Sequence, residues 1–444
     1  MTFPSGLRAL NHRDFRIVFA GQSVALVGMW MQQVAQAWLV LQLTNSPLKL
    51  GLIGTLNFAP ALLFSLVAGA VADRVPKRRL LTITQALMAI PAITLFALVE
   101  THAVQAWMVL GLILARGAVN SVDNPARQSF VSEMVGTDRV VNAVSLNSVI
   151  VHTARIAGPA LAAIVIATAG VGPCFAINAA SFVAMLVALR RMDPRALEPA
   201  PVATREPGQL RAAVRYVLAT PELRTPLAMM AVVGTLSFNF QVLLPLLARF
   251  TWDGTASAYA ALTCAMGVGS VCGALVAGAR GKVGVGLLSG AAVAFGAATL
   301  AAAAAPSLGV QLLVLAPLGA ASVTFAAGVN SSLQLAAGPL RGRVMALYSV
   351  VFLGSTPIGA PFIGWIAETA GPRVGLIIGG GVALATAAAA GVAYRRLPRP
   401  PAERPPRHGR PGRDGPAGSP RRREGLRVRV PARARSAAPA GSAR

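Results

Sequence analysis

Four ionisable side chains stand within or at the ends of long apolar stretches, and these are the residues best able to do chemistry. They are Arg116, Asp123, His152 and Arg155. A charged residue at the centre of a bilayer costs about 2.5 to 3.5 kcal/mol on insertion scales, so each should face a cavity or a partner. We therefore expect these four to bind a polar substrate or to couple its movement to an ion.

The roles of two of these residues stay open. His152 lies one helical turn before Arg155 and is the only histidine within an apolar stretch. Because histidine titrates near neutral pH, it could carry a coupling proton; equally, it could be a structural hydrogen-bonding residue. Asp123 is the best-placed carboxylate for coupling, and its alternative role is an ion pair with Arg127 at the helix end.

Amide side chains are denser in the apolar stretches than lipid-facing helices need. Each of them needs a hydrogen-bond partner in hydrocarbon, either across a water-filled cavity or between two helices. The sequence leaves both roles open for every one. The candidates for lining a central cavity are Gln32, Gln36, Asn57, Asn239, Gln241, Asn330 and Gln334.

The composition shows which elements must position these residues. Of the 444 residues, 55% are hydrophobic and only 12% are charged, about half the charged fraction of a soluble protein. Twelve apolar stretches are long enough to cross about 30 Å of hydrocarbon as helices. They lie near residues 16–40, 48–71, 80–99, 104–124, 142–168, 172–190, 225–248, 257–279, 284–304, 307–330, 344–367 and 374–393. The sequence predicts an all-α membrane protein with twelve transmembrane helices.

The basic residues predict the orientation of these helices. The formal net charge is +25, yet the loops expected outside contain only Lys49, Arg249 and Arg373 as basic residues. Lys and Arg in short loops are retained in the cytoplasm, so we expect both termini there. The basic cytoplasmic face fits anionic lipid better than nucleic acid.

The same pattern divides the chain into four parts. Residues 1–190 and 224–394 should each form a six-helix bundle, and short matches between the two suggest a duplicated unit. Residues 191–223 should form a cytoplasmic linker, with a short helix over 210–218. Residues 395–444 are rich in Arg and Pro and lack apolar periodicity, which predicts a disordered basic tail.

The loop after the second stretch contains a charged motif that could act as a conformational latch. Its residues are Gly69, Asp73, Arg74, Lys77 and Arg78. Their order resembles the loop signature of the major facilitator superfamily, although Pro76 replaces a usual Gly. The second-half copy has Ala277 where the acid would stand. The resemblance implies two pseudo-symmetric six-helix bundles and transport by alternating access.

Further motifs resemble the subgroup of that superfamily that contains the enterobactin exporter. They are Asp123-Asn124-Pro125-Ala126-Arg127, Asn142-Ala143, Arg155, Gly158-Pro159 and Arg343-Val344-Met345-Ala346. Gly158 and Pro159, with Gly359 and Pro361 in the second half, are candidate helix bends. Alanines replace most glycines of the exporter pattern in the fifth stretch. The resemblance implies export of a small amphipathic compound, drug-like or siderophore-like.

We conclude from the sequence that the chain is a secondary exporter of the bacterial inner membrane, coupled to protons as an antiporter. The sequence contains no recognisable nucleotide-binding motif, metal-ligand cluster or catalytic triad, so we expect no enzyme activity, no cofactor and no metal. We also expect a monomer. The alternatives are an importer or lipid flippase of the same fold, or a non-transporting membrane sensor or scaffold.

Overall fold

The computed structural model describes residues 5–136, 139–193, 197, 209–280 and 285–395. Much of the expected linker and all of the expected tail from residue 396 onward lie outside these residues. The first half contains η1 (Ser5–Asn11), α1 (Arg13–Thr44), α2 (Pro47–Arg74), α3 (Lys77–Glu100), α4 (Ala106–Val135), α5 (Val140–Ala169) and α6 (Gly172–Arg191). The second half contains α7 (Gln209–Ala219), α8 (Pro221–Leu236), α9 (Phe240–Leu246), η4 (Leu247–Thr251), α10 (Ala256–Arg280), α11 (Val285–Ala303), α12 (Leu308–Ala336), η5 (Gly338–Leu340), α13 (Arg341–Ala370) and α14 (Pro372–Arg395).

The helices match the apolar stretches of the sequence. In the described part of the chain, 11 helical segments are long and apolar enough to cross a membrane. The remaining expected span is α11, whose apolar part, Leu287–Ala303, is somewhat shorter. The prediction of an all-α membrane protein is confirmed.

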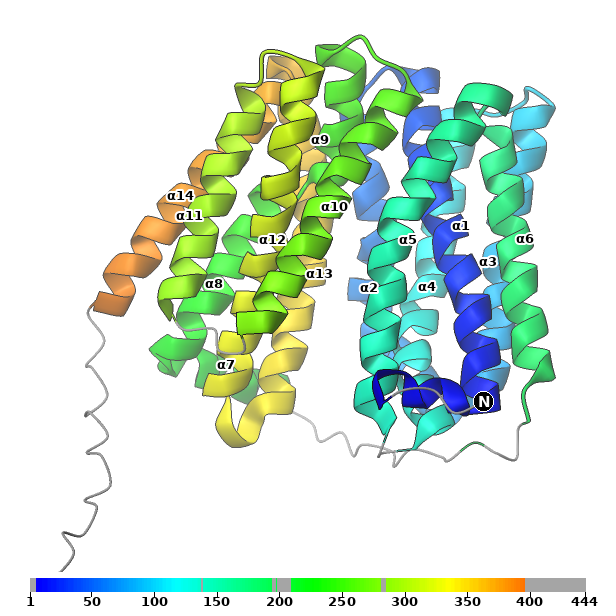
Figure 1. The fold of residues 1–444 in the computed structure, drawn as a ribbon, viewed down its shortest axis with the longest axis horizontal. Coiled ribbons are helices and arrows are strands. Elements are labelled where there is room, and N and C mark those ends of the chain that lie inside the picture. Colours follow the sequence, from blue (N-terminus) through cyan, green and yellow to red (C-terminus); the bar gives the residue numbers. More distant parts are fainter. Residues whose placement is uncertain (1–4, 137–138, 194–196, 198–208, 281–284, 396–444) are drawn as a thin grey trace, which may run out of the picture. The chain divides into compact units, whose positions relative to one another are not determined.

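Helices α1 to α6 form one bundle, and α8 to α14 form a second (Figure 1). In the first bundle α2 packs on α4, and in the second α10 packs on α12. Likewise α3 packs on α6, and α11 packs on α14. The same partners therefore recur six spans later, as in a duplicated unit.

One span differs from the uninterrupted helix that the sequence predicts over 225–248. The helix stops at Leu236 and resumes at Phe240. The Asn239 side chain donates from Nδ2 to the carbonyl of Thr235 at 2.7 Å, and Ser237 Oγ donates to the carbonyl of Gly379 at 2.7 Å. These side chains satisfy carbonyl groups around the break, which hydrocarbon could not do.

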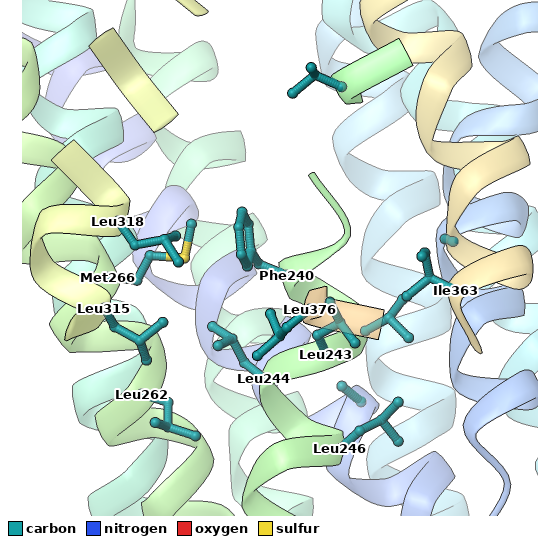
Figure 2. Packing of buried hydrophobic residues seen from close by; sticks show 14 of the residues in the cluster. Phe240, Leu243, Leu244, Leu246, Leu262, Met266, Leu315, Leu318, Ile363 and Leu376 are labelled. Atoms are coloured by element: carbon teal, nitrogen blue, oxygen red, sulfur yellow. The ribbon is translucent and has the colours of Figure 1, made fainter. Parts of the chain in front are cut away.

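The core of the second bundle surrounds α9. Its side chains Phe240, Leu243 and Leu244 lie between two layers of apolar residues (Figure 2). On one side lie Leu262, Met266, Leu315 and Leu318, from α10 and α12, and on the other lies Ile363 of α13, while Leu376 of α14 lies beside Leu243. Because lipid is as apolar as these residues, close packing rather than water release stabilises the layers.

The two bundles meet through α2 with α13 and through α5 with α10. We call the end of the protein that carries Arg74 and Lys77 the basic end, and the opposite end, which carries Ser46 and Glu368, the far end. At the far end, Ser46 Oγ and the amide of Leu48 each donate to Glu368 Oε2 at 2.8 Å. This carboxylate therefore joins the start of α2 to the end of α13.

Candidate functional site

A cavity of about 300 Å³ lies between the two bundles. The first bundle contributes residues of α1, α2 and α5, and the second contributes residues of α9, α10, α12 and α13 and of the break before α9. The polar and aromatic members of the lining are Trp30, Gln33, Phe58, Arg155, Phe238, Asn239, Phe240, Gln241, Tyr259, Ser322, Phe352, Ser355 and Thr356. Aromatic walls with a few polar groups are typical of a small-molecule site.

Arg155 is the one charged side chain among the described residues that line this central cavity. Its guanidinium carbon lies 5.6 Å from the centroid of the Trp30 ring, in the range of a cation–π interaction. Gly158, one turn further along α5, allows this approach, because a Cβ there would collide with the Cβ of Trp30. Pro159 follows within the helix.

The break before α9 exposes two predicted cavity residues to the central cavity. Asn239 and Gln241 both line it. Asn239 Nδ2 is held by Thr235, while its buried Oδ1 has no hydrogen-bond partner in the described part of the chain. An acceptor oxygen therefore remains for a donor group of a substrate or a water molecule.

A larger cavity of about 480 Å³ lies within the first bundle and contains two of the other predicted residues. Asp123 is 1% exposed there and accepts from Thr84 Oγ1 at 2.6 Å and from Gln85 Nε2 at 2.9 Å. Arg127 forms an ion pair with its other oxygen. Asp123 thus has the ion pair that was its alternative role, together with two neutral donors.

Arg116 also lines this second cavity, but it contacts an amide rather than an acid. Its Nη2 donates to Asn57 Oδ1 on α2 at 2.6 Å. Its Nε is buried and has no partner among the described residues. Asn57 thus lies between α2 and α4 rather than at the central cavity.

His152 lies on α5 between the residues of the two cavities, since Val151 lines the second cavity and Arg155 the central one. Its ring is partly buried, and Nδ1 is buried without a hydrogen-bond partner in the described residues. The structure thus places a titratable group with a free ring nitrogen at this boundary.

Four of the predicted cavity residues form hydrogen bonds between side chains instead. Gln32 accepts from Asn178 Nδ2 on α6 and donates to Gln36 Oε1 at 3.5 Å, and both glutamines are buried. At the basic end of α12, Gln334 donates to Asn330 and accepts from Arg341. These contacts tie helices of one bundle to each other.

The described contacts of the candidate latch lie within the first bundle. Lys77 Nζ is 3.7 Å from Glu133 Oε1 on α4. Arg78 donates from Nε to the carbonyl of Leu189 at 2.7 Å and from Nη2 to that of Arg190 at 3.2 Å. These are carbonyls of the last turn of α6, which lack helical partners.

The remaining latch residues, Gly69, Asp73 and Arg74, lie in the last turns of α2. Gly69 is buried, Arg74 is exposed in its last turn, and the Asp73 side chain lies outside the described part.

The second-half bend residues have a packing role. A Cβ at Gly359 would collide with the carbonyl oxygen of Thr235, so glycine lets α13 touch α8. Pro357 and Pro361 both lie within α13.

Sequence reasoning missed the aromatic residues of the central cavity, and among the glutamines of the first span it selected Gln32 and Gln36 rather than Gln33. Trp30, Gln33 and Ala37 share one face of α1, and Gln32 and Gln36 lie on the neighbouring face, about 100° away. The cluster of Phe238, Phe240 and Tyr259 around the expected seventh and eighth spans was the available signal. In the described part of the chain, no group of three His, Cys, Asp or Glu could hold a metal.

Comparison with known proteins decides the family. The family described as transmembrane secretion effectors, within the major facilitator superfamily, matches residues 4–408. The chain belongs to this family. The predicted resemblance is therefore confirmed, and the chain is a multi-pass membrane protein. The homologues and fold of this chain are those of major facilitator transporters, which are not enzymes.

Two curated relatives show how similar the chain is to transporters of known substrate. It is 25% identical over 260 residues to the staphyloferrin A transporter of Staphylococcus aureus, covering 58% of this chain and 65% of the relative. It is 27% identical over 271 residues to the enterobactin exporter EntS of Citrobacter koseri, covering 60% of this chain and 64% of the relative. Each alignment spans less than two thirds of the relative.

Solved structures show the same fold. The nucleoside transporter NupG matches with a TM-score of 0.66 at 13% identity, covering 87% of this chain and 100% of that one. A bacterial homologue of the human lysosomal transporter Spinster, in an inward-facing and occupied conformation, matches with a TM-score of 0.67 at 15% identity, covering 89% and 98%. At these identities the likeness concerns the fold alone.

Proposed function

We propose that this protein is a secondary exporter that moves a small amphipathic anion through the central cavity by alternating access. The observation that carries the proposal is the lining of that cavity, where Arg155 is the one charge among the described residues and aromatic rings surround it. A cation without a carboxylate partner favours an anionic substrate, and the rings favour a substrate with an apolar body.

Two further observations support this function. The relatives are named as a transporter of staphyloferrin A and an exporter of enterobactin, so a siderophore-like compound is the first class to test. The bundles are hydrogen-bonded at the far end through Glu368. In an alternating-access cycle, contacts of this kind hold one end closed while the opposite end, here the basic end, is open. With the basic end in the cytoplasm, such a state would take up substrate from inside.

We further propose that transport is coupled to protons and that His152 carries the coupling proton. Its Nδ1, which has no partner in the part of the chain that the structure describes, lies one turn from Arg155, so a proton there and an anion at Arg155 would influence each other. The chain would then exchange a proton moving inward for a substrate moving outward.

Transport in proteoliposomes tests the function. We would reconstitute the full chain and measure accumulation of radiolabelled catecholate and hydroxycarboxylate siderophores, with and without an imposed pH gradient. We expect gradient-driven accumulation of at least one of them, and about tenfold less in Arg155→Gln, which removes the cation. Gradient-driven movement in the opposite direction would assign import. Folded, inserted protein that moves none of these compounds would contradict export of this class.

A further inference from the structure

The second cavity is separate from the proposed transport cavity. It lies within the first bundle, has about 480 Å³ of space and shares no lining residue with the central cavity. Cavities of roughly 300 to 1,000 Å³ hold small organic molecules. Nothing in the proposed function of the central cavity requires this second space.

One face of α4 lines this cavity with polar side chains. Arg116, Asn120, Asn124 and Gln128 follow each other at four-residue intervals, so they form a stripe along the helix. The last of them lies toward the basic end. The stripe thus provides a polar track from the basic end to Arg116 in the interior of the bundle.

The charges of this cavity do not balance. Asp123 and Arg127 neutralise each other as an ion pair. Arg116 remains, and in the described part of the chain its side chain has an amide oxygen as partner and no carboxylate. Its buried Nε–H donates to nothing there. An uncompensated cation and an unused donor in a low-dielectric interior are both costly, and an anion would relieve both costs.

The other walls of the cavity are mostly apolar or already paired, apart from Gln85 Oε1 on α3, which is buried without a partner in the described part of the chain. Gln22 Nε2 donates to Asn147 Oδ1 at 2.7 Å, which joins α1 to α5. The remaining apolar lining is Ala25, Leu26, Met29, Met88, Val131, Val144, Val151 and Phe182. A ligand with an anionic head at Arg116 and a flat or aliphatic body would match both walls.

We propose that the second cavity is an anion subsite, in which Arg116 binds the carboxylate of a small amphipathic molecule. Guanidinium N–H groups suit a carboxylate because two parallel donors meet its two oxygens. As a staging site between the basic end and Arg155, this subsite deepens the proposed function and rests on it. Its ligand binding is independent of transport and is tested separately.

Weak binding of a simple aromatic carboxylate provides the test. We would use purified full chain in detergent micelles and follow 4-fluorobenzoate by ¹⁹F NMR line broadening, with 4-fluorobenzamide as the neutral probe of equal shape. The parent protein for this series is Arg155→Gln, which leaves the second cavity as the remaining site. Arg116→Gln is then added to it. Arg79→Gln, at an exposed residue of α3 outside both cavities, is the matched control.

We expect the Arg155→Gln parent to bind 4-fluorobenzoate and to prefer it to the amide. Adding Arg116→Gln should weaken binding of the carboxylate by about tenfold or more and leave the amide unchanged. Adding Arg79→Gln should change neither. Equal carboxylate binding with and without Arg116→Gln would overturn the subsite.

A second variant keeps the proposal falsifiable if Arg116→Gln fails to fold. Asn120→Leu removes an exposed amide of the stripe without touching the contact of Arg116 with Asn57. We expect several-fold weaker carboxylate binding from it, and unchanged binding would count against the track.

Loss of transport in Arg155→Gln with intact binding at Arg116 would support both sites. Binding at Arg116 in a protein that transports nothing would contradict only the proposed function.

Discussion

At the scale of single residues, the protein accommodates buried charge in three different ways. Asp123 is surrounded by an arginine and two neutral donors, which is a fully satisfied arrangement. Arg155 lies over the ring of Trp30. Arg116 contacts an amide oxygen, and its Nε–H has no partner among the described residues. The first arrangement is typical of structural groups, and the last two leave a cation able to bind a ligand.

The Asp123 arrangement predicts a loss of stability. Asp123→Asn leaves the largely buried Arg127 without its counter-charge, which should lower the free energy of unfolding by about 3 kcal/mol. The measurement is the midpoint of thermal or denaturant unfolding in detergent. The double variant with Arg127→Gln should recover part of the loss, because it removes the unpaired cation. A single variant as stable as the parent would show that the ion pair contributes nothing.

His152 predicts a change in coupling rather than in stability. His152→Gln keeps a hydrogen-bonding side chain but cannot titrate, so transport should lose its dependence on the pH gradient while substrate exchange continues. Proteoliposome flux with and without the gradient separates the two. Full gradient-driven transport in this variant would exclude His152 as the coupling group, and Asp123 would then be the next residue to test.

At the scale of elements, the seventh span shows how a membrane helix can be broken and remain stable. Across the gap between α8 and α9, Asn239 donates back to the carbonyl of Thr235, while Ser237 within the gap donates to the carbonyl of Gly379 on α14. The same region packs against α13, where Gly359 faces the carbonyl of Thr235 without space for a side chain. Non-helical backbone is tolerated within a membrane where it is buried in protein or lines a cavity. Here one side of the break lines the central cavity, and the other side packs against neighbouring helices.

The packing of α13 on α8 predicts a severe effect of the smallest substitution. Gly359→Ala should force the two helices apart and reduce the yield of monodisperse protein, because the new methyl group would overlap a backbone oxygen that cannot rotate away. Gly381→Ala is the matched control, since a Cβ there meets nothing within 4 Å. Size-exclusion chromatography compares the two. Equal yields would show that the helices can separate at little cost.

At the scale of the whole molecule, hydrogen bonds at the far end join the two bundles. Glu368 contacts Ser46 and Leu48 across the two bundles. Nearer the middle, Thr55 Oγ1 donates to the carbonyl of Pro357 at 2.9 Å, again between α2 and α13. In the proposed alternating-access cycle, these contacts must break when the protein opens toward the far end, so we expect them to influence the balance between the two states.

Removing the Glu368 carboxylate should shift that balance. In a chain whose Cys174, Cys264 and Cys272 are replaced by Ala, Thr356→Cys places a thiol in the central cavity. We expect Glu368→Ala to increase the rate at which a membrane-impermeant maleimide, added on the far side, labels this thiol by several-fold. Glu100→Ala is the control, because the Glu100 carboxylate lies against Gly172 within the first bundle. Equal labelling in both variants would argue against the contact.

The sequence by itself determined the number of spans, their approximate limits and the family. Hydropathy is a local property, and a stretch of about 20 apolar residues that faces lipid must satisfy its backbone hydrogen bonds as a helix. The helix over residues 210–218 of the linker was also predicted, and α7 occupies Gln209–Ala219. The motif around Gly69 and Lys77 indicated the superfamily, because those residues are close together along the chain.

The tertiary structure alone decided which polar residues face a cavity. Gln33 lines the central cavity and Gln32 bonds to Asn178, although one peptide bond separates them. That choice depends on the rotation of α1, which is set by its contacts with α5 and α6, more than 100 residues away. The break at Asn239 and the open donor of Arg116 likewise arise from contacts with distant helices. A one-dimensional pattern gives the polarity of a helix, but its neighbours determine where each face points.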